Sequence, residues 1–161
     1  GKAYGEKLSV RNSGSIDQYV RVTLYRYWED KDGNRVTDVS PGLIELELAG
    51  NGWVEDPSAG TEERVVLYYT GILPAGQETP ALSKTLTIKE EAAFMTAGGD
   101  GQGNEGTGGG SGNRPAYRYN GLRFVLEAEV NAVQTHNAED AIKSAWGVDV
   151  SVGTDGSISL R

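Results

Sequence analysis

Apolar and polar residues alternate on both sides of a short turn sequence between Leu8 and Trp28. From Val20 onward the even-numbered positions are apolar with one exception, Arg26, while the odd-numbered positions hold tyrosine or polar residues. A period of two is typical of a β-strand with one face in a core. The Asn-Ser-Gly-Ser sequence at 12–15 favours a chain reversal, because such residues tolerate positive φ or bond their own backbone. The stretch therefore predicts two strands joined by a tight corner.

Strand patterns recur at short intervals along the rest of the chain. An Asp-Gly pair within 29–35 predicts a hairpin. The run at 64–70 is apolar on both faces, which predicts a strand inside a sheet rather than at its edge. The other segments with a strand pattern are 43–48, 53–54, 82–88, 119–133, which is the longest, and a hairpin within 148–160.

One short helix is predicted near 137–146. Asn137 precedes it as an N-cap, and Gly147 ends it. Its apolar stripe consists of Ala138, Ala141, Ile142, Ala145 and Trp146. About seven or eight strands with short turns and one small helix predict an all-β fold, an antiparallel β-sandwich of jelly-roll or immunoglobulin-like type. The length of 161 residues is typical of one domain, so residues 1–161 are expected to form a single sandwich.

A glycine-rich segment separates two of the predicted strands. Residues 97–113 are mostly glycine and polar residues, with too little apolar surface to offset the entropy of ordering. We expect a long flexible loop there, preceded by a short helical turn at 90–96.

Composition narrows the classes of partner. The formal net charge of −8 and the absence of a basic cluster disfavour nucleic acids and anionic membranes. The chain has no cysteine, so thiol catalysis, disulfides and thiolate metal sites are excluded. No apolar run approaches the roughly 18 residues that span a bilayer, so we expect no membrane insertion. The absence of cysteine suits an exported protein, and the abrupt start at Gly1 suggests a processed form.

A calcium loop is the first candidate for metal chemistry. Asp30, Asp32 and Asn34 have the spacing of the first three ligands of an EF-hand. However, Arg35 replaces the required glycine, and Pro41 stands where the bidentate glutamate belongs. The hairpin interpretation is therefore favoured, and no cofactor is expected.

Few residues in the sequence have the arrangement of a catalytic site. His136 is the only histidine, at a strand-to-helix junction without a nucleophile-elbow sequence nearby. Glu127 and Glu129 project from one strand face about 7 Å apart, a spacing that inverting glycosidases use. Glu45 and Glu47 repeat that pattern, which is typical of a solvated strand face. No catalytic residue is assigned, and the protein is expected not to be an enzyme.

Three tyrosines are the candidate binding residues. Tyr19, Tyr25 and Tyr27 share the odd-numbered face of their strand, opposite the predicted core. Tyrosine offers a flat apolar ring with a polar tip, so this face is a candidate for stacking on a sugar. Ordinary cross-strand packing explains the same residues, and it is the favoured interpretation.

Several loose motifs resemble a family of exported proteins of Gram-positive bacteria, the camelysin/TasA family. The chain is similar to that family in the strand, corner and Tyr-Val-Arg-Val strand at 10–22, in Trp53, in the Tyr-Tyr-x-x-x-Leu-x-x-Gly element within 68–76, and in 128–134 followed by 145–147. The resemblance implies a jelly-roll-like β-sandwich and secretion with a signal peptide that a dedicated peptidase removes. It also implies extracellular fibres or surface layers, which some members build by lending an N-terminal strand to the next subunit.

Two hypotheses for function follow. The first is a non-enzymatic structural protein of the cell surface or extracellular matrix, such as a biofilm, that pairs strands with itself or with other surface proteins. The second is a module that binds carbohydrate or a host surface through the tyrosine face. We expect most of the family's first strand to be missing before the corner, which would leave an open sheet edge there. The chain has no His-Glu-x-x-His sequence, so the protease activity ascribed to camelysin is not carried over.

Overall fold

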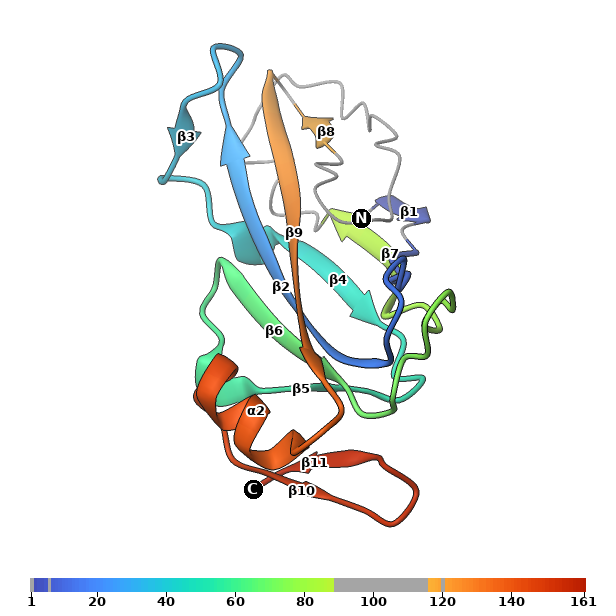
Figure 1. The fold of residues 1–161 in the computed structure, drawn as a ribbon. Helices are drawn as coiled ribbons and strands as arrows, with labels where there is room; N and C mark the ends of the chain where they lie inside the picture. The colour runs from blue at the N-terminus through green and yellow to red at the C-terminus, as the bar shows by residue number, and fades with distance from the viewer. Residues whose placement is uncertain (1, 6, 89–115, 120) are drawn as a thin grey trace.

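The structure is a computed structural model that describes residues 2–5, 7–88, 116–119 and 121–161. Its described elements are almost all antiparallel strands, which confirms the predicted all-β, sandwich-like class. In chain order they are β1 (Lys2–Gly5), β2 (Gln18–Glu29), β3 (Arg35–Val36), the 3-10 helix η1 (Pro41–Leu43), β4 (Ile44–Leu48), β5 (Trp53–Glu55), the 3-10 helix η2 (Pro57–Ala59), β6 (Arg64–Tyr69), β7 (Ser83–Ile88), β8 (Ala116–Tyr119), β9 (Leu122–Gln134), the helix α2 (Ala138–Trp146), β10 (Val150–Val152) and β11 (Ile158–Leu160) (Figure 1).

The larger sheet is centred on β2, the strand that the alternating sequence predicts. Its order is β5-β6-β2-β9-β8, and β3 pairs with the far end of β2. β9 lies along the whole of β2, from Gln18 opposite Gln134 to Glu29 opposite Arg123. β6 lies between β5 and β2, as its two apolar faces predict.

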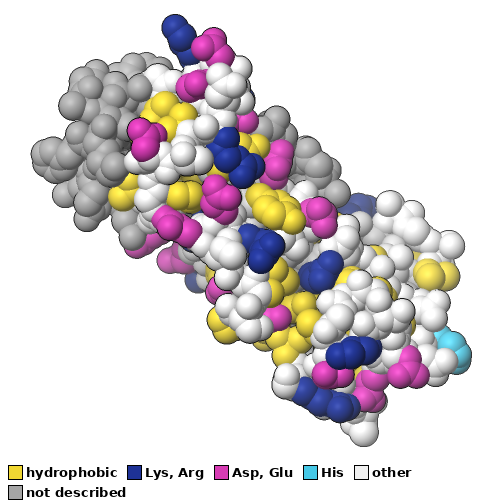
Figure 2. Space-filling model, turned by 90° about the vertical axis from the view of Figure 1, so that its left-hand side faces the viewer, with side chains coloured by type: hydrophobic (Ala, Val, Ile, Leu, Met, Phe, Trp, Pro, Cys, Tyr) yellow, Lys and Arg dark blue, Asp and Glu magenta, His cyan; other side chains and the backbone are white. Residues whose placement is uncertain are grey.

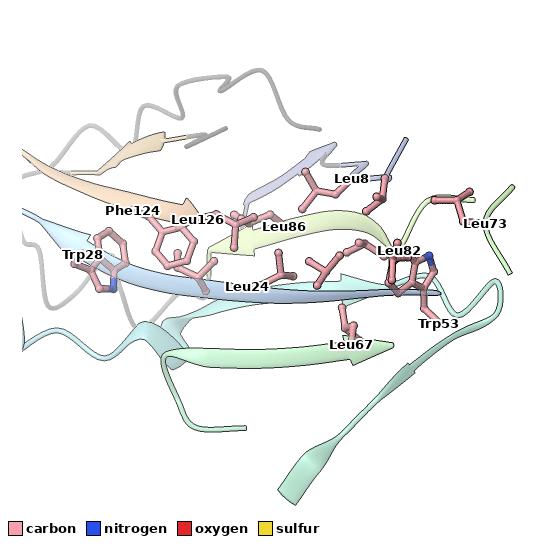
Figure 3. Packing of buried hydrophobic residues seen from close by; sticks show 14 of the residues in the cluster. Leu8, Leu24, Trp28, Trp53, Leu67, Leu73, Leu82, Leu86, Phe124 and Leu126 are labelled. Atoms are coloured by element: carbon pink, nitrogen blue, oxygen red, sulfur yellow. The ribbon is translucent and has the colours of Figure 1, made fainter. Parts of the chain in front are cut away.

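The smaller sheet has the order β1-β7-β4 and packs over one face of the larger sheet. The even-numbered apolar residues of β2 meet side chains from β4 and β7 in the layer between the sheets (Figure 3). Trp28 is fully buried there, with its ring 5.5 Å from Phe124. The period of two in β2 thus reflects burial of its even-numbered face, as expected from the sequence.

Arg26, the polar exception in this apolar row, ties the two sheets together. Its Nε donates to the carbonyl of Glu62 at 2.8 Å, and its Nη1 donates to the carbonyl of Ile44, at the start of β4, at 3.3 Å. Burial lowers the pKa of this guanidinium, and the carboxylates of Glu62 and Glu55 oppose that effect. The Arg26 guanidinium is therefore hydrogen-bonded at the edge of the core rather than inside it.

The opposite face of the larger sheet is covered at one end by a second apolar cluster. Helix α2 and the β10–β11 hairpin lie across the ends of β2, β6 and β9 (Figure 1). Arg21 of β2 lies 5.3 Å from the Trp146 ring of the helix and donates to Asn131. The buried members of this cluster are Tyr19, Val133, Ala138, Ile142, Val150 and Ile158.

The predicted long strand at 119–133 is wrong at its beginning. The structure has two antiparallel strands, β8 and β9, with Tyr119 opposite Leu122. Gly121 adopts a φ of 78°, a conformation that glycine tolerates because it has no Cβ. The Asn-Gly pair at 120–121 is a standard turn signal that the apolar pattern around it obscures.

The helix confirms the predicted segment but not its N-cap. Asn137 has a φ of 51° and makes no side-chain capping bond. The left-handed backbone at this residue turns the chain out of β9, and it does not present the side chain to the first helical turn. Gly147 ends the helix as predicted, with a φ of 72° and its N–H bonded to the Lys143 carbonyl. The expected loop at 97–113 and helical turn at 90–96 lie outside the described residues.

Candidate functional site

The N-terminal segment forms one edge of the smaller sheet. Beyond β1, residues 8–12 continue alongside 76–82 in nearly the same antiparallel register. The N–H of Leu82 donates to the carbonyl of Leu8 at 2.7 Å, and the N–H of Thr79 donates to the carbonyl of Val10 at 2.8 Å. The corner after this segment then carries the chain into β2, as the sequence predicts.

Side-chain hydroxyl groups replace two of the usual carbonyl acceptors in this pairing. The N–H of Leu8 donates to Ser83 Oγ at 3.1 Å, and the N–H of Val10 donates to Thr79 Oγ1 at 3.0 Å. Both hydroxyl-bearing residues are buried. Side-chain and main-chain acceptors therefore alternate along this part of the N-terminal segment. For this reason regular strand pairing is limited to β1.

The outer edge of this segment is open. Even-numbered residues direct their backbone groups toward 77–83, so Lys7, Ser9 and Arg11 direct theirs away from the sheet. No described residue bonds the backbone groups of these three residues. The side chains of Lys7 and Arg11 are exposed, and Ser9 donates to Glu78 at 2.5 Å. Such an edge is a template for a further strand.

Apolar side chains on the core side of the N-terminal segment hold this edge in place. Leu8 and Val10 are buried in the core between the sheets, and Figure 3 shows Leu8 there. A small cavity of about 10 Å³ remains between this segment and the larger sheet. Its lining residues are Leu8, Ser9, Val10, Val22, Leu24, Leu82, Ala128 and Val130.

Asn12 fixes the point where the edge strand ends. Its Nδ2 donates to the carbonyls of Ile16 at 2.8 Å and Leu73 at 3.0 Å, and its Oδ1 accepts from the N–H of Gly14 at 3.0 Å. Its backbone bonds Gln77 and Gly76. With 3% of its surface exposed, Asn12 joins the corner, the edge strand and the 73–77 turn.

The residues before the corner do form a strand in the structure. β1 and residues 8–12 supply a strand along β7 and the segment before it. The alternation of Leu8 and Val10 predicts that strand locally. Its partner lies about 70 residues away, and the buried hydroxyls of Thr79 and Ser83 carry no sequence signal of their own.

Tyr19 is not available as a binding residue. It is 1% exposed, and its hydroxyl donates to the carbonyl of Gly156 at 2.5 Å. Burial, together with the nearby Asp155 carboxylate, raises the pKa of this phenol. The residue anchors the C-terminal hairpin to β2, so its ring serves packing.

Tyr27 and Tyr25 do not complete an exposed platform either. Tyr27 is 6% exposed, with the Arg35 guanidinium 4.1 Å from its ring centroid. Tyr25 is half-buried between Arg64 and Glu127 on the neighbouring strands. The candidate stacking face of three tyrosines is therefore wrong as an exposed surface, because the C-terminal hairpin covers Tyr19 and Arg35 of the adjacent hairpin covers Tyr27.

The calcium candidate is a hydrogen-bonded turn in the structure. Asp30 Oδ1 accepts from the N–H groups of Asp32 and Asn34, both at 2.9 Å, and β2 pairs with β3 beyond it. This confirms the predicted hairpin. Within the described residues, no three His, Cys, Asp or Glu side chains gather in a group that would hold a metal ion.

The Asp30 turn is expected to weaken on acidification. The backbone N–H of Asn34 is the main cause that holds the pKa of Asp30 below its usual value. Because the folded-state pKa is lower than the unfolded one, the stabilisation is present above the unfolded pKa and is lost as the pH falls through the folded one. An NMR titration of the Asp30 carboxyl carbon measures this directly, and a midpoint at or above that of an unfolded peptide would contradict it.

The remaining candidates lie apart from one another. His136 is exposed at the junction before α2. Glu127 and Glu129 lie on β9, opposite Tyr25 and Thr23 of β2. On the face shown in Figure 2, basic and acidic side chains are interspersed over the length of the described part.

Comparison with protein-family models, with curated proteins and with solved structures finds no match for this chain. None of the helices in the described part of the chain is long and apolar enough to cross a membrane.

The fold and the site define a β-sandwich-like protein with a strand edge, built from its own N-terminal segment, that no other described strand pairs with.

Proposed function

We propose that this protein is a non-enzymatic, exported structural protein that associates with copies of itself by pairing strands. The open edge at Lys7, Ser9 and Arg11 carries the proposal, because its outward backbone groups have no partner among the described residues. A strand that pairs there gains main-chain hydrogen bonds without any rearrangement of the core. Location at the cell surface or in an extracellular matrix rests on the family resemblance of 10–22 and 68–76.

The carbohydrate-binding alternative receives less support from the molecule. It relied on three exposed tyrosines, and only Tyr25 retains substantial exposure. One half-buried ring between charged neighbours offers less stacking surface than the predicted platform. Strand pairing is therefore the function that the geometry favours.

Proline at position 9 is expected to stop self-association while the fold survives. The N–H of Ser9 points away from the sheet, so its loss costs no backbone bond inside the molecule, whereas proline blocks an incoming strand. Sedimentation velocity over a concentration series, with electron microscopy of the same samples, compares the unmodified chain with Ser9→Pro. We expect concentration-dependent assemblies only from the unmodified chain.

Ser9→Ala is the matched control for this experiment. It removes the hydroxyl that donates to Glu78 but retains the backbone N–H, so it should assemble like the unmodified chain. Urea unfolding of all three proteins verifies that they are folded. Assembly by Ser9→Pro at the unmodified level, or a strictly monomeric unmodified chain, would refute the proposal.

A further inference from the structure

The smaller sheet has a second edge, formed by β4. The N–H of Ile44 bonds the carbonyl of Pro41, and its carbonyl accepts from Arg26, so the backbone groups of Ile44 point away from β7. Alternation in an antiparallel ladder places the groups of Leu46 on the same outward side. No described strand pairs with this side of β4, so β4 offers a short edge centred on Leu46, at the opposite side of the sheet from the N-terminal segment.

The two edges carry opposite charge on the same face. Glu45 and Glu47 are exposed on the outer face of β4, because Ile44 and Leu46 face the core. Lys7 and Arg11 are exposed on the outer face of the N-terminal edge by the same alternation about Leu8. Opposite charges on adjacent strands stabilise pairing, and like charges oppose it.

A groove beside β4 provides room for side chains from a neighbour. It has a volume of about 340 Å³ and opens on the outer face of the smaller sheet. Its lining residues are Arg26, Glu45, Leu46, Glu47, Thr85 and Thr87. Two of the lining residues, Glu45 and Glu47, are acidic, and one, Arg26, is basic, with its guanidinium bonded to two carbonyls.

Resting on the proposed self-association, we infer that the basic N-terminal edge of one copy pairs with the acidic β4 edge of the next. β1 and β4 are both antiparallel to β7, so copies in one orientation meet as parallel strands. The two surfaces differ, so the contact is heterologous and leaves a free edge of each kind at the ends. Repetition extends the smaller sheet from copy to copy as an open filament.

Charge reversal tests this pairing. Lys7→Glu/Arg11→Glu gives a chain with two acidic edges, and Glu45→Lys/Glu47→Lys gives a chain with two basic edges. Each variant alone is expected to self-associate roughly tenfold to a hundredfold more weakly than the unmodified chain. An equimolar mixture of the two should assemble again, because each acidic edge then meets a basic one.

Matched controls change the net charge equally at other exposed positions. Lys31→Glu/Lys143→Glu and Asp38→Lys/Glu129→Lys should assemble like the unmodified chain. Raising the salt concentration should weaken assembly of the unmodified chain, since exposed charges are screened. If the edge variants assemble normally, or if their mixture fails to assemble, the inference is overturned while the proposed function still stands.

An engineered disulfide that can be reduced distinguishes pairing at the N-terminal edge from release of the N-terminal strand. Gly5 lies opposite Thr85 in a non-hydrogen-bonded pair, where Cα atoms are about 4.5 Å apart and a disulfide fits. An added Cβ at Gly5 meets no atom within 4 Å, and the chain has no other cysteine. Oxidised Gly5→Cys/Thr85→Cys is expected to assemble as well as its reduced form. Assembly only after reduction would overturn edge pairing in favour of strand release, and no assembly by the unmodified chain would refute the proposed function itself.

Discussion

Trp28→Ala is expected to lower the free energy of unfolding by about 3–5 kcal/mol, the usual cost of deleting a large aromatic side chain from a core. Trp28 is fully buried and packs edge-on against Phe124. Its Nε1 also donates to the carbonyl of Ser40 at 3.0 Å, just before η1 and β4. The residue therefore joins β2 to the segment that leads into the smaller sheet, and its loss removes both core packing and this hydrogen bond.

Urea unfolding followed by circular dichroism measures this effect. Tyr25→Ala is the matched control, because Tyr25 lies on the same strand but is half-buried on the opposite face. We expect a clearly smaller loss for Tyr25→Ala and an intermediate one for Trp28→Phe, which keeps a ring but removes the donor to Ser40. Equal losses for Trp28→Ala and Tyr25→Ala would contradict the assignment of the core to the even-numbered face.

Asn12→Ala is expected to cost about 2–3 kcal/mol, because it removes three side-chain hydrogen bonds from a buried corner. Asn12→Asp should be worse at neutral pH, since a carboxylate would face the carbonyls of Ile16 and Leu73 where the amide now donates. Such a site raises the folded-state pKa of the new carboxyl. Stability of Asn12→Asp is then fully present below the unfolded pKa and is lost as the pH rises through the folded one.

Thermal unfolding of the Asn12 variants between about pH 4 and pH 7 measures this dependence. Ser13→Ala, at the exposed neighbouring residue, is the control and should behave like the unmodified chain. Because Asn12 ends the N-terminal edge strand, Asn12→Ala should also weaken self-association more than Ser13→Ala does. A stability of Asn12→Asp that rises with pH over this range would show that the amide is not required as a donor.

The local pattern of apolar and polar residues was sufficient to predict the positions of most strands. Val20, Val22 and Leu24 alternate with polar neighbours because β2 buries one face in the layer between the sheets. The Asp-Gly turn at 32–33, the glycine that ends α2, and the corner at 12–15 all follow from conformational preferences of single residues. The missed turn at 120–121 was also readable, since Asn-Gly is a local signal.

Residues whose role depends on a distant partner were not predictable in this way. Tyr19 follows the same alternation as Tyr25, yet the C-terminal hairpin, 137 residues further along the chain, covers it. Arg26 interrupts an apolar row because carbonyls from two other segments reach its guanidinium. Periodicity reports which side of a strand a residue occupies, but it does not report what covers that side.

By itself, then, the sequence determined an antiparallel sandwich-like class, the positions of most strands and the helix near 137–146, because these follow from short-range periodicity and backbone preference. Only the tertiary structure decided that the odd-numbered face of β2 is partly a second core and that residues 2–5 and 8–12 lie along the edge of a sheet. It also placed Lys7 and Arg11 at one edge of a sheet whose other edge carries Glu45 and Glu47. Strand order and register arise from contacts between residues far apart in the chain, so no local pattern encodes them.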